Sequence, residues 1–370
     1  MKAATIMRIA RAGSVRARRR ALTSGLGARR LAATAAALRL GVLDALDAKP
    51  RSTRELASQL ADSQPDAAQV PAGGPGVHRV DADPVSDLDR VAMLDAFLHV
   101  LAGEGLLRGG DREWRLTRLG HALVADDTAR AMFEAFDGYH TGLYRELDEP
   151  LFRAVPRRDT QDQADLVARL SRLLEPLILD ELTKALSEGG AGRVLDIGCG
   201  SGALLVHMLQ AAPGARGVGV DVASEAVAQT ARACARAGVG HRVDLATGDA
   251  TQVLTGTDLV PEGSLDLAVA ANVVYYLDPA ALAGLLEVVA ARLRPGGVLV
   301  VITTDLDESV ISRHLDLLLR TQSPAMALVG RDALVAALTS AGLQISRVKR
   351  LAPGDPLIAV HARRPVVLAM

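Results

Sequence analysis

Aromatic residues are scarce in this chain of 370 residues, which has four phenylalanines, four tyrosines and one tryptophan. Cysteine is scarcer still, and the two present, Cys199 and Cys234, exclude the disulfide framework on which small secreted domains depend. No apolar run reaches the roughly 18 residues that a membrane-spanning helix needs. These absences favour a globular protein of a reducing compartment. We expect a cytoplasmic location and no membrane partner.

Lysine is also rare, and acidic residues are missing from the first 43 positions, which hold ten basic residues including the run RARRR at 16–20. An arginine-rich, acid-poor start is typical of a transit peptide, of a nucleic-acid-binding arm, or of a disordered extension. The formal net charge of the whole chain is −1, so overall charge favours no polyanionic partner. We interpret residues 1–30 as a disordered basic extension.

Residues 31–124 have the pattern of a small helical domain. The segment LAATAAALRLGVLDALDA has apolar residues at helical spacing, and STRELASQLA opens with Ser52 and Glu55 in a capping box. A loop rich in proline and glycine over 62–86 precedes LDRVAMLDAFLHVLAGEGLL, which predicts a longer helix. The stretch RGGDREWRLTRLG then alternates like a hairpin. Together these elements have the order of a winged helix.

A winged helix is commonly a DNA-binding fold, but its third helix here lacks the basic and amide side chains that read base edges. That helix instead carries an apolar stripe, formed by Met93, Leu94, Phe97, Leu98 and Leu101. With the Ala- and Leu-rich helix at 31–46, the stripe offers more apolar surface than one small domain needs to bury. We therefore expect a homodimer formed through this half and no nucleic-acid partner.

Residues 125–188 are predicted to be a helical connector, and the pattern changes from residue 193 onward. The apolar strands RVLDIG, RGVGVDV, HRVDLATGD, LDLAVAANVV and GVLVVITTD alternate with helices that begin near residues 202, 224, 279 and 330. This alternation predicts a doubly wound parallel sheet, in the α/β class. The tail LQISRVKRLAPGDPLIAVHAR predicts a C-terminal antiparallel hairpin. Residues 189–370 should thus form a Rossmann-like sheet of seven strands.

The segment RVLDIGCGSGALL, residues 193–205, places three glycines within five residues, between an apolar run and a helix-like one. Gly198, Gly200 and Ala203 fit the dinucleotide fingerprint G-x-G-x-x-A. Asp221 follows at about the 20-residue spacing expected of a ribose-binding acid. The turn alone therefore fits either NAD or S-adenosylmethionine.

Four features favour S-adenosylmethionine. Asp196 lies at the entrance of the turn, where a carboxylate would repel a pyrophosphate but attract a sulfonium and an ammonium. Asp249, in ATGDA at the end of the third strand, is placed to accept a hydrogen bond from an exocyclic amine. The fourth strand ends in the segment AANVVYYLD, which is expected to lie over the site. LRPGGVLVV leads into a fifth strand, which the hairpin follows.

The motifs VLDIGCGSG, GVDVAS, TGDA and LRPGG, in this order, resemble those of the class I S-adenosylmethionine-dependent methyltransferases. The resemblance covers about residues 31–363 and is closest to the two-domain small-molecule methyltransferases, which have an N-terminal winged-helix dimerisation domain. It implies S-adenosylmethionine as cofactor. The cofactor-binding residues that it implies are Asp196, Gly198, Gly200, Gly202, Asp221, Val222, Asp249, Ala250 and Asn272.

The resemblance also implies a role for each part of this set. The glycines allow backbone contact with the methionyl part of the cofactor, and Asp196 lies close by. Asp221 holds the ribose hydroxyls, Asp249 binds the adenine amino group, and Asn272 lines the methionyl end. Transfer of the methyl group to a small-molecule acceptor is then the expected reaction.

The acceptor side is predicted from the uneven distribution of aromatic residues. Five of the nine lie between Phe133 and Phe152, and two tyrosines follow the fourth strand. In the family, the connector and the end of the fourth strand lie over the acceptor cavity. We expect the acceptor pocket to be lined by Tyr139, Tyr144, Tyr276 and Asp305.

The catalytic base is the point at which this sequence departs from the family. Plant-type O-methyltransferases place a histidine just after the fourth strand, but NVVYYLDP has none there. His140 and Tyr275 are the predicted catalytic residues in its place, and Asp305 and His314 are weaker candidates. Alternatively, the acceptor is already acidic and needs only positioning. We expect no metal site, because the eight histidines show no ligand spacing.

The sequence therefore predicts methylation of a small molecule in bacterial specialised metabolism, with O-methylation favoured over C- or N-methylation. Two alternatives stay open at this point. One is an enzyme of the same fold that uses S-adenosylmethionine as an electrostatic element for a cyclisation or an elimination. The other is a regulator without enzymatic activity that senses the cofactor through its winged helix.

Overall fold

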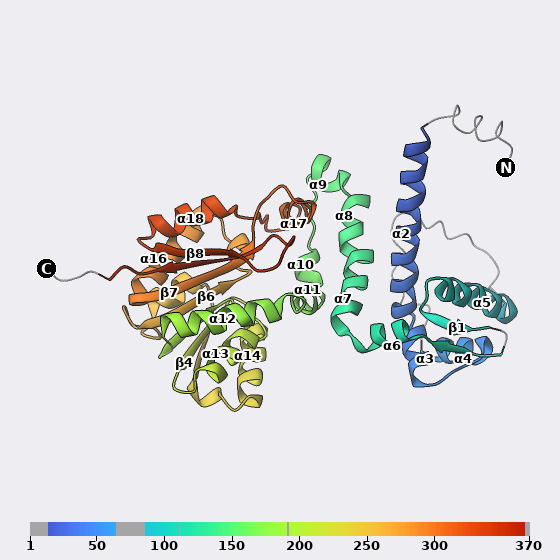
Figure 1. Ribbon diagram of the computed structural model, residues 1–370, viewed down its shortest axis with the longest axis horizontal. Helices are drawn as coiled ribbons and strands as arrows, with labels where there is room; N and C mark the ends of the chain where they lie inside the picture. The colour runs from blue at the N-terminus through green and yellow to red at the C-terminus, as the bar shows by residue number, and fades with distance from the viewer. Residues whose placement is uncertain (1–13, 64–85, 111, 191, 367–370) are drawn as a thin grey trace. The chain divides into compact units, whose positions relative to one another are not determined.

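The computed structural model describes residues 14–63, 86–110, 112–190 and 192–366 (Figure 1). The chain divides into two compact units. The N-terminal unit extends to Arg145 and includes Asp165–Leu170, and the second unit contains Glu146–Ala164 and the chain from Ser171 onward. The predicted connector is thus divided between the two units. In the described part, no helix is both long and apolar enough to cross a membrane.

The N-terminal unit is mainly helical, with one small hairpin. Its elements are α2 (Val15–Arg39), α3 (Val42–Ala48), α4 (Thr53–Ser63), α5 (Asp87–Gly103), β1 (Leu107–Gly109), β2 (Trp114–Leu116), α6 (Arg118–Ala125), α7 (Asp127–Ala135), the π-helical turn η2 (Phe136–His140), α8 (Thr141–Arg145) and α11 (Ala164–Ser171). From α3 to β2, the order of helix, helix, longer helix and hairpin is the predicted one. Most of the predicted loop at 62–86 lies outside the described residues.

Helix α2 begins earlier than predicted. The prediction of a disordered extension is wrong for residues 15–30, because they form the first part of this helix. The Ser14 hydroxyl accepts a hydrogen bond from the Ala17 N–H at 3.2 Å and so caps the helix. Arginine is also a good helix former, and the stretch is rich in it. The rest of the predicted extension, residues 1–13, lies outside the described part.

The core of the N-terminal unit surrounds Trp114, which is fully buried on β2. Its indole N–H donates to Thr53 Oγ1 at 3.1 Å, so the hairpin is tied to the start of α4. The predicted capping box is confirmed there, since the Ser52 N–H donates to Glu55 Oε2 at 2.8 Å and the Glu55 N–H donates to Ser52 Oγ at 3.3 Å. The predicted stripe on α5 is buried only in part. Leu98 and Leu101 are fully buried, whereas Met93 is 57% exposed.

The second unit is an α/β layer structure. Its helices are α9 (Asp148–Phe152), α10 (Asp159–Asp162), α12 (Glu175–Gly189), α13 (Ala203–Ala211), α14 (Ser224–Arg236), α15 (Ala250–Gly256), α16 (Pro279–Arg292), α17 (Val310–Arg320) and α18 (Arg331–Ser340), with the short 3-10 helices η3 (Gly240–Arg242) and η4 (Val274–Tyr276). Its strands are β3 (Arg193–Ile197), β4 (Arg216–Asp221), β5 (Val243–Thr247), β6 (Leu265–Ala271), β7 (Leu293–Thr304), β8 (Gln344–Arg350) and β9 (Leu357–Arg363). The sequence did not predict α15 and α17.

The seven strands form one sheet in the order β5-β4-β3-β6-β7-β9-β8. All neighbours are parallel except β9, which is antiparallel to both β7 and β8. The predicted Rossmann-like sheet with a C-terminal antiparallel hairpin is therefore confirmed. Because the strand order reverses direction between β3 and β6, the crevice at the carboxyl ends of these strands is the expected ligand site.

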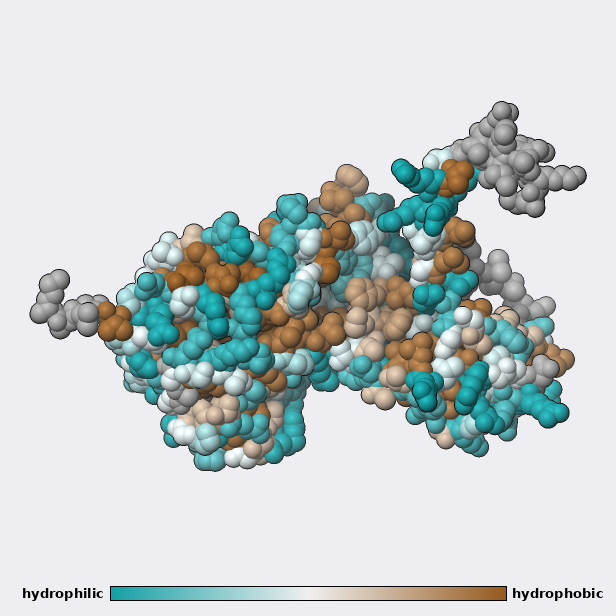
Figure 2. Space-filling view, viewed as in Figure 1, coloured by the Kyte–Doolittle hydropathy of each residue, from teal (hydrophilic) through white to brown (hydrophobic). Residues whose placement is uncertain are grey.

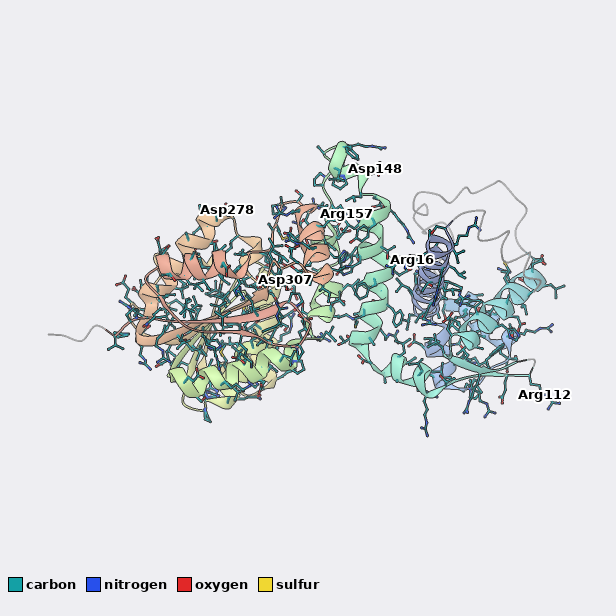
Figure 3. The ribbon with its side chains drawn as sticks, turned by 45° about the horizontal axis from the view of Figure 1, so that its top comes forward. Arg16, Arg112, Asp148, Arg157, Asp278 and Asp307 are labelled. Atoms are coloured by element: carbon teal, nitrogen blue, oxygen red, sulfur yellow. The ribbon has the colours of Figure 1, made fainter. Side chains whose placement is uncertain are left out.

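Helices cover both faces of the sheet (Figure 1). Helices α16 and α18 pack on one face, and α12, α13 and α14 pack on the other. Side chains of strand β3 alternate between the two faces, as this arrangement requires. Leu195 and Ile197 pack in the core on the side of α16 and α18, and Val194 packs in the core on the side of α12, α13 and α14. Helix α16 begins at Pro279, as predicted, and the carboxylate of the preceding Asp278 caps it by accepting the N–H groups of Ala280 and Ala281 (Figure 3).

Candidate functional site

The turn after β3 has the backbone conformation that glycine favours. Gly198, Gly200 and Gly202 have φ values of +71°, +52° and +80°. A Cβ at Gly198 would lie 2.6 Å from Val273 Cγ2, and one at Gly202 would lie 2.9 Å from Thr230 Cα. The turn therefore needs glycine both for its conformation and for its close contacts. It leaves bare backbone exposed at the end of β3.

A cavity of 340 Å³ lies at the carboxyl ends of β3, β4, β5 and β6. Among the residues predicted for the site, it is lined by Gly198, Asp221, Val222, Asp249, Ala250, Asn272 and Tyr276. The remaining lining residues are Ile197, Val220, Gly248, Thr251, Ala271, Val273, Leu277 and Leu285. The sequence did not single out this second group. Its members are mostly small or apolar, and nothing distinguishes them from core residues before the fold is known.

Two carboxylates of the cavity are positioned by backbone N–H groups. Asp221 Oδ2 accepts from Gly200 at 3.0 Å, and Oδ1 accepts from Ala223 at 2.9 Å. Asp249 Oδ1 accepts from Gln252 at 3.0 Å and so caps α15. An ionised carboxylate has about four lone-pair sites, so each group keeps acceptor capacity for a ligand in the cavity. Both residues thus hold the local backbone and face the predicted site.

Asn272 has the left-handed φ of +56°, which few residues other than glycine adopt. Asparagine tolerates this conformation better than most, and the Asn272 N–H donates to the Ile302 carbonyl at 2.8 Å. Such strain is frequent at functional sites. The left-handed conformation of Asn272 ends β6 and turns the chain into η4 along the cavity.

The two tyrosines of η4 have different surroundings. Tyr276 lines the cavity and is half-exposed. Tyr275 packs against a small cluster that contains Leu319 and Met326, and its carbonyl accepts the Ala327 N–H at 3.3 Å. Burial and the neighbouring Tyr276 phenol raise the pKa of Tyr275 well above its usual value. Its hydroxyl therefore stays protonated at neutral pH, which suits a hydrogen-bond donor better than a general base.

Asp196 does not line the cavity, although the sequence predicts it close to the cofactor. Its side chain is buried, and neither carboxylate oxygen has a hydrogen-bond partner among the described residues. Burial, together with the negative charge of Asp221, raises the pKa of Asp196 to about 7.

Gly200 and Gly202 are not lining residues of the cavity either. Gly200 acts by holding Asp221, and Gly202 allows α14 to approach.

Asp305 and His314 lie beyond the end of β7. Asp305 is buried, and its Oδ1 accepts the Arg331 N–H at 2.7 Å at the start of α18. This contact assigns the carboxylate a structural task, and Asp305 is not among the residues that line the cavity. His314 is half-buried on α17, and burial lowers its pKa, so its imidazole is neutral at pH 7.

His140, Tyr139 and Tyr144 belong to the N-terminal unit. The His140 ring stacks on Tyr139 with ring centroids 4.4 Å apart, and its centroid lies 4.8 Å from that of Phe136. Tyr139 is buried, whereas Tyr144 is 55% exposed. The cavity lies in the other unit, so the roles of these three residues at the acceptor side stay predictions.

The composition of the cavity fits S-adenosylmethionine. The lining residues include Asp221 and Asp249 but no lysine, arginine or histidine. The two carboxylates oppose a pyrophosphate, even one held by the backbone N–H groups of the glycine turn, and favour a cationic ligand. The apolar side chains of Val222, Leu277 and Leu285 suit the faces of an adenine ring. In the described residues, no group of acidic, histidine or cysteine side chains is arranged to hold a metal ion.

Comparison with known sequences gives a consistent result. Residues 194–297 match the family model described as a methyltransferase domain. A release factor glutamine methyltransferase of Rhodospirillum rubrum is 33% identical over 201 residues, which are 49% of this chain and 62% of that protein. The chain thus spans less than two thirds of the length of the curated relatives that it matches first.

Solved structures match almost the whole chain. The mitomycin 7-O-methyltransferase MmcR has a TM-score of 0.69 at 20% identity, over 96% of this chain and 99% of that one. An N,N-8-amino-8-demethyl-D-riboflavin dimethyltransferase from Streptomyces davawensis also has a TM-score of 0.69 at 20% identity, over 94% and 99% of the two chains. Human N-acetylserotonin methyltransferase, solved in complex with S-adenosylmethionine, has a TM-score of 0.65 at 19% identity, over 96% and 100%.

The matches and the cavity lead to the same assignment. The matched methyltransferase domain spans β3 to the start of β7, which includes the glycine turn, Asp221, Asp249 and Asn272. The predicted cofactor, S-adenosylmethionine, is confirmed. Residues 194–297 are thus a methyltransferase domain, and the fold of the chain is that of the two-domain small-molecule methyltransferases that use S-adenosylmethionine.

Proposed function

We propose that this protein transfers the methyl group of S-adenosylmethionine to a small-molecule acceptor of bacterial specialised metabolism, with an oxygen acceptor favoured over nitrogen or carbon. The observation that carries the proposal is the extent of the structural match. The mitomycin 7-O-methyltransferase matches 96% of this chain, including the N-terminal unit, whereas the release factor methyltransferase matches 49%. The dimethyltransferase that acts on an amino group keeps N-methylation as the nearest alternative.

The cavity residues divide the work of holding the cofactor. Asp221 would accept hydrogen bonds from the ribose hydroxyls, Asp249 would accept one from the adenine amino group, and Asn272 would hold the methionyl end. When bound, S-adenosylmethionine supplies an electrophilic methyl group, so the protein has to align a nucleophile and exclude water. Alignment alone contributes at most about 7–11 kcal/mol to lowering the barrier.

The state of Tyr275 bears on which acceptors can react. Since its hydroxyl stays protonated, Tyr275 does not remove a proton from the acceptor at neutral pH. The acceptor is therefore either nucleophilic without help, as an acidic phenol or a free amine is, or it relies on a base such as His140. We favour the first arrangement and treat Tyr275 as a positioning residue.

An acceptor screen with methyl-labelled S-adenosylmethionine tests the proposal. We expect label to appear in one class of small molecule, such as phenols, amines or carbon acids, and identification of the labelled atom separates O- from N- or C-methylation. Label only in a protein or peptide substrate would contradict the proposal. Conversion of the acceptor without label would instead support cyclisation or elimination. Salt-dependent DNA binding without turnover would support a regulator.

We also propose that the N-terminal unit forms a homodimer. Several large apolar side chains of this unit are exposed, and Figure 2 shows hydrophobic side chains on its surface among hydrophilic ones. They include Leu22, Leu26, Leu88, Met93 and Val100. Excess apolar surface of this kind usually marks an interface. Light scattering should show a dimer, and a particle of 38.7 kDa at micromolar concentration would contradict it.

We infer a cytoplasmic location from the cysteines, because Cys199 and Cys234 are both buried and unpaired. Fractionation of the producing cells would test this location. Recovery of the protein outside the cytoplasm would contradict it.

A further inference from the structure

Asp196 is a buried acid whose role the cavity geometry leaves unexplained. It lies on β3, one residue before the cavity wall begins at Ile197, and its side chain is 1% exposed. Neither oxygen has a hydrogen-bond partner in the described part of the chain. Most buried polar atoms are hydrogen-bonded, and a buried carboxylate without partners is costly in its ionised form. Such a group calls for a compensating positive charge.

In the described part of the chain, the strands on either side of Asp196 supply no such charge. Its neighbours in the sheet are Gly219 on β4 and Val269 on β6, which have no polar side chains. A weak interaction with the backbone N–H of Leu205 on α13 favours the ionised form of Asp196, but it supplies no full positive charge. Thr230 on α14 does not compensate either, because its hydroxyl donates to the Gly200 carbonyl at 3.0 Å.

The titratable groups that face Asp196 add negative charge or none. Asp221, at the end of β4, opposes ionisation of Asp196. The thiol of Cys199 in the turn has its pKa raised to about 12, mainly by burial, and burial also raises the pKa of Cys234 on α14. Both thiols are therefore neutral at pH 7. A cation bound beside the glycine turn would be the first positive charge that Asp196 meets.

We propose that Asp196 is the residue by which the site distinguishes cationic S-adenosylmethionine from S-adenosylhomocysteine, whose sulfur is uncharged. When the sulfonium binds, Asp196 loses a proton to water, and its buried carboxylate, one residue before the cavity wall, offsets the added positive charge. When methyl transfer leaves a neutral thioether, Asp196 takes a proton back from water. The buried acid thus weakens product binding relative to cofactor binding. This proposal rests on the cofactor and not on the identity of the acceptor.

The proposal sets the direction of the pH dependence. Above pH 7 Asp196 is already ionised, so S-adenosylmethionine binds without releasing a proton. Below pH 7 the proton must leave, and affinity for S-adenosylmethionine falls by up to about tenfold per pH unit. S-adenosylhomocysteine has the same ammonium and carboxylate but no sulfonium, so the ratio of the two affinities isolates the charge on sulfur.

Isothermal titration calorimetry of the full chain with each ligand at pH 6, 7 and 8 tests the proposal. For the wild type, we expect the preference for S-adenosylmethionine over S-adenosylhomocysteine to fall about tenfold between pH 8 and pH 6. Titrations at pH 6 in two buffers of different ionisation enthalpy should show proton release with S-adenosylmethionine and less with S-adenosylhomocysteine. This part needs no variant and does not depend on the stability of one.

Two variants complete the experiment. Asp196→Asn should have a preference that does not change with pH. Asp316→Asn is the matched control, since Asp316 is also buried but accepts hydrogen bonds from Leu328 and Arg320, away from the cavity. It should retain the wild-type pH dependence. A wild-type preference that is constant from pH 6 to 8, with equal proton release for both ligands, would overturn the proposal. The proposed methyl transfer would be unaffected by that result.

Discussion

Gly41 and Gly202 have the same backbone conformation in the two units, yet they face different constraints. Each precedes a helix, α3 or α13, with φ of +74° or +80°. A Cβ at Gly41 would meet nothing within 4 Å, whereas one at Gly202 would lie 2.9 Å from the backbone of Thr230. In the N-terminal unit, the glycine serves only its own turn. In the second unit, it also allows α14 to pack against the turn that borders the cofactor site.

Carboxylates in the two units differ in the same way. Asp44 pairs with Arg130 at 2.6 Å and ties α3 to α7, so its partner is another side chain. Asp221 accepts N–H groups from Gly200 and Ala223, so its partners belong to the backbone around the cavity. The carboxylate in the N-terminal unit thus joins two helices through an ion pair, whereas the carboxylate in the second unit fixes the backbone around the cavity. Substitutions in the two units should therefore affect different properties.

The largest expected effect is on stability, at the centre of the N-terminal unit. Trp114→Ala removes a fully buried indole and its hydrogen bond to Thr53, and we expect a loss of about 3–5 kcal/mol in the free energy of unfolding. Chemical denaturation measures this loss. The folded variant should bind S-adenosylmethionine with nearly unchanged affinity, because Trp114 lies outside the unit that holds the cavity. A large loss of affinity for S-adenosylmethionine would contradict the expectation that substitutions in the N-terminal unit affect stability and not cofactor binding.

The next effect is on cofactor affinity. In the proposed role of Asp221, Asp221→Ala would remove two charge-assisted hydrogen bonds to the ribose, each worth about 1.5–3 kcal/mol, so binding of S-adenosylmethionine should weaken by at least about tenfold. Asp44→Ala is the matched control from the N-terminal unit and should leave affinity unchanged. Calorimetry measures both. Equal affinity in the wild type and Asp221→Ala would remove Asp221 from the site.

Substitution of Gly41 and of Gly202 by alanine compares the two units by the change in the free energy of unfolding. Gly41→Ala should cost about 1–2 kcal/mol in stability, the usual penalty for a left-handed residue other than glycine, with no effect on the cofactor. Gly202→Ala should cost about 1–3 kcal/mol more because of the contact with Thr230, and it should also weaken cofactor binding. Equal destabilisation by both substitutions would show that the contact with α14 is unimportant.

The smallest expected effect is at Tyr275. Because its hydroxyl is protonated at neutral pH, Tyr275→Phe should lower the rate of methyl transfer by less than about tenfold, with no change in the pH–rate profile below pH 9 and no change in cofactor affinity. If Tyr275 were the base, the loss would be about 10²–10⁴-fold. Steady-state rates from pH 6 to 9 separate these outcomes, and His140→Ala tests the other predicted base by the same criterion.

The sheet and most of the polar lining of the cavity were predictable from the sequence because several signals coincide there. Glycine spacing, apolar strands and strand-end aspartates all mark the residues around Gly198, Asp221 and Asp249. Asp196 was predicted to lie near the cofactor from its place in the motif, but its isolation depends on Gly219 and Val269, which only the strand order brings beside it.

Other features had no comparable signal in the sequence. The apolar lining of the cavity, such as Leu277 and Leu285, has the same composition as the core. The prediction for residues 15–30 was wrong because a high arginine content is compatible with either a helix or disorder, and only the structure shows that Ser14 caps a helix there. The place of Asp305 in the acceptor pocket stays a prediction. Its hydrogen bond with the Arg331 N–H could not be predicted, because Arg331 follows it by more than 20 residues in the chain.

The central claim is that the cavity at the ends of β3, β4, β5 and β6 binds S-adenosylmethionine and not a dinucleotide. Calorimetric titration of the wild-type chain with S-adenosylmethionine and, separately, with NAD tests it most directly. We predict saturable binding of one S-adenosylmethionine per chain and no saturable binding of NAD, because the carboxylates of Asp221 and Asp249 line the cavity and would repel a pyrophosphate. Saturable binding of NAD, with none of S-adenosylmethionine, would contradict the account.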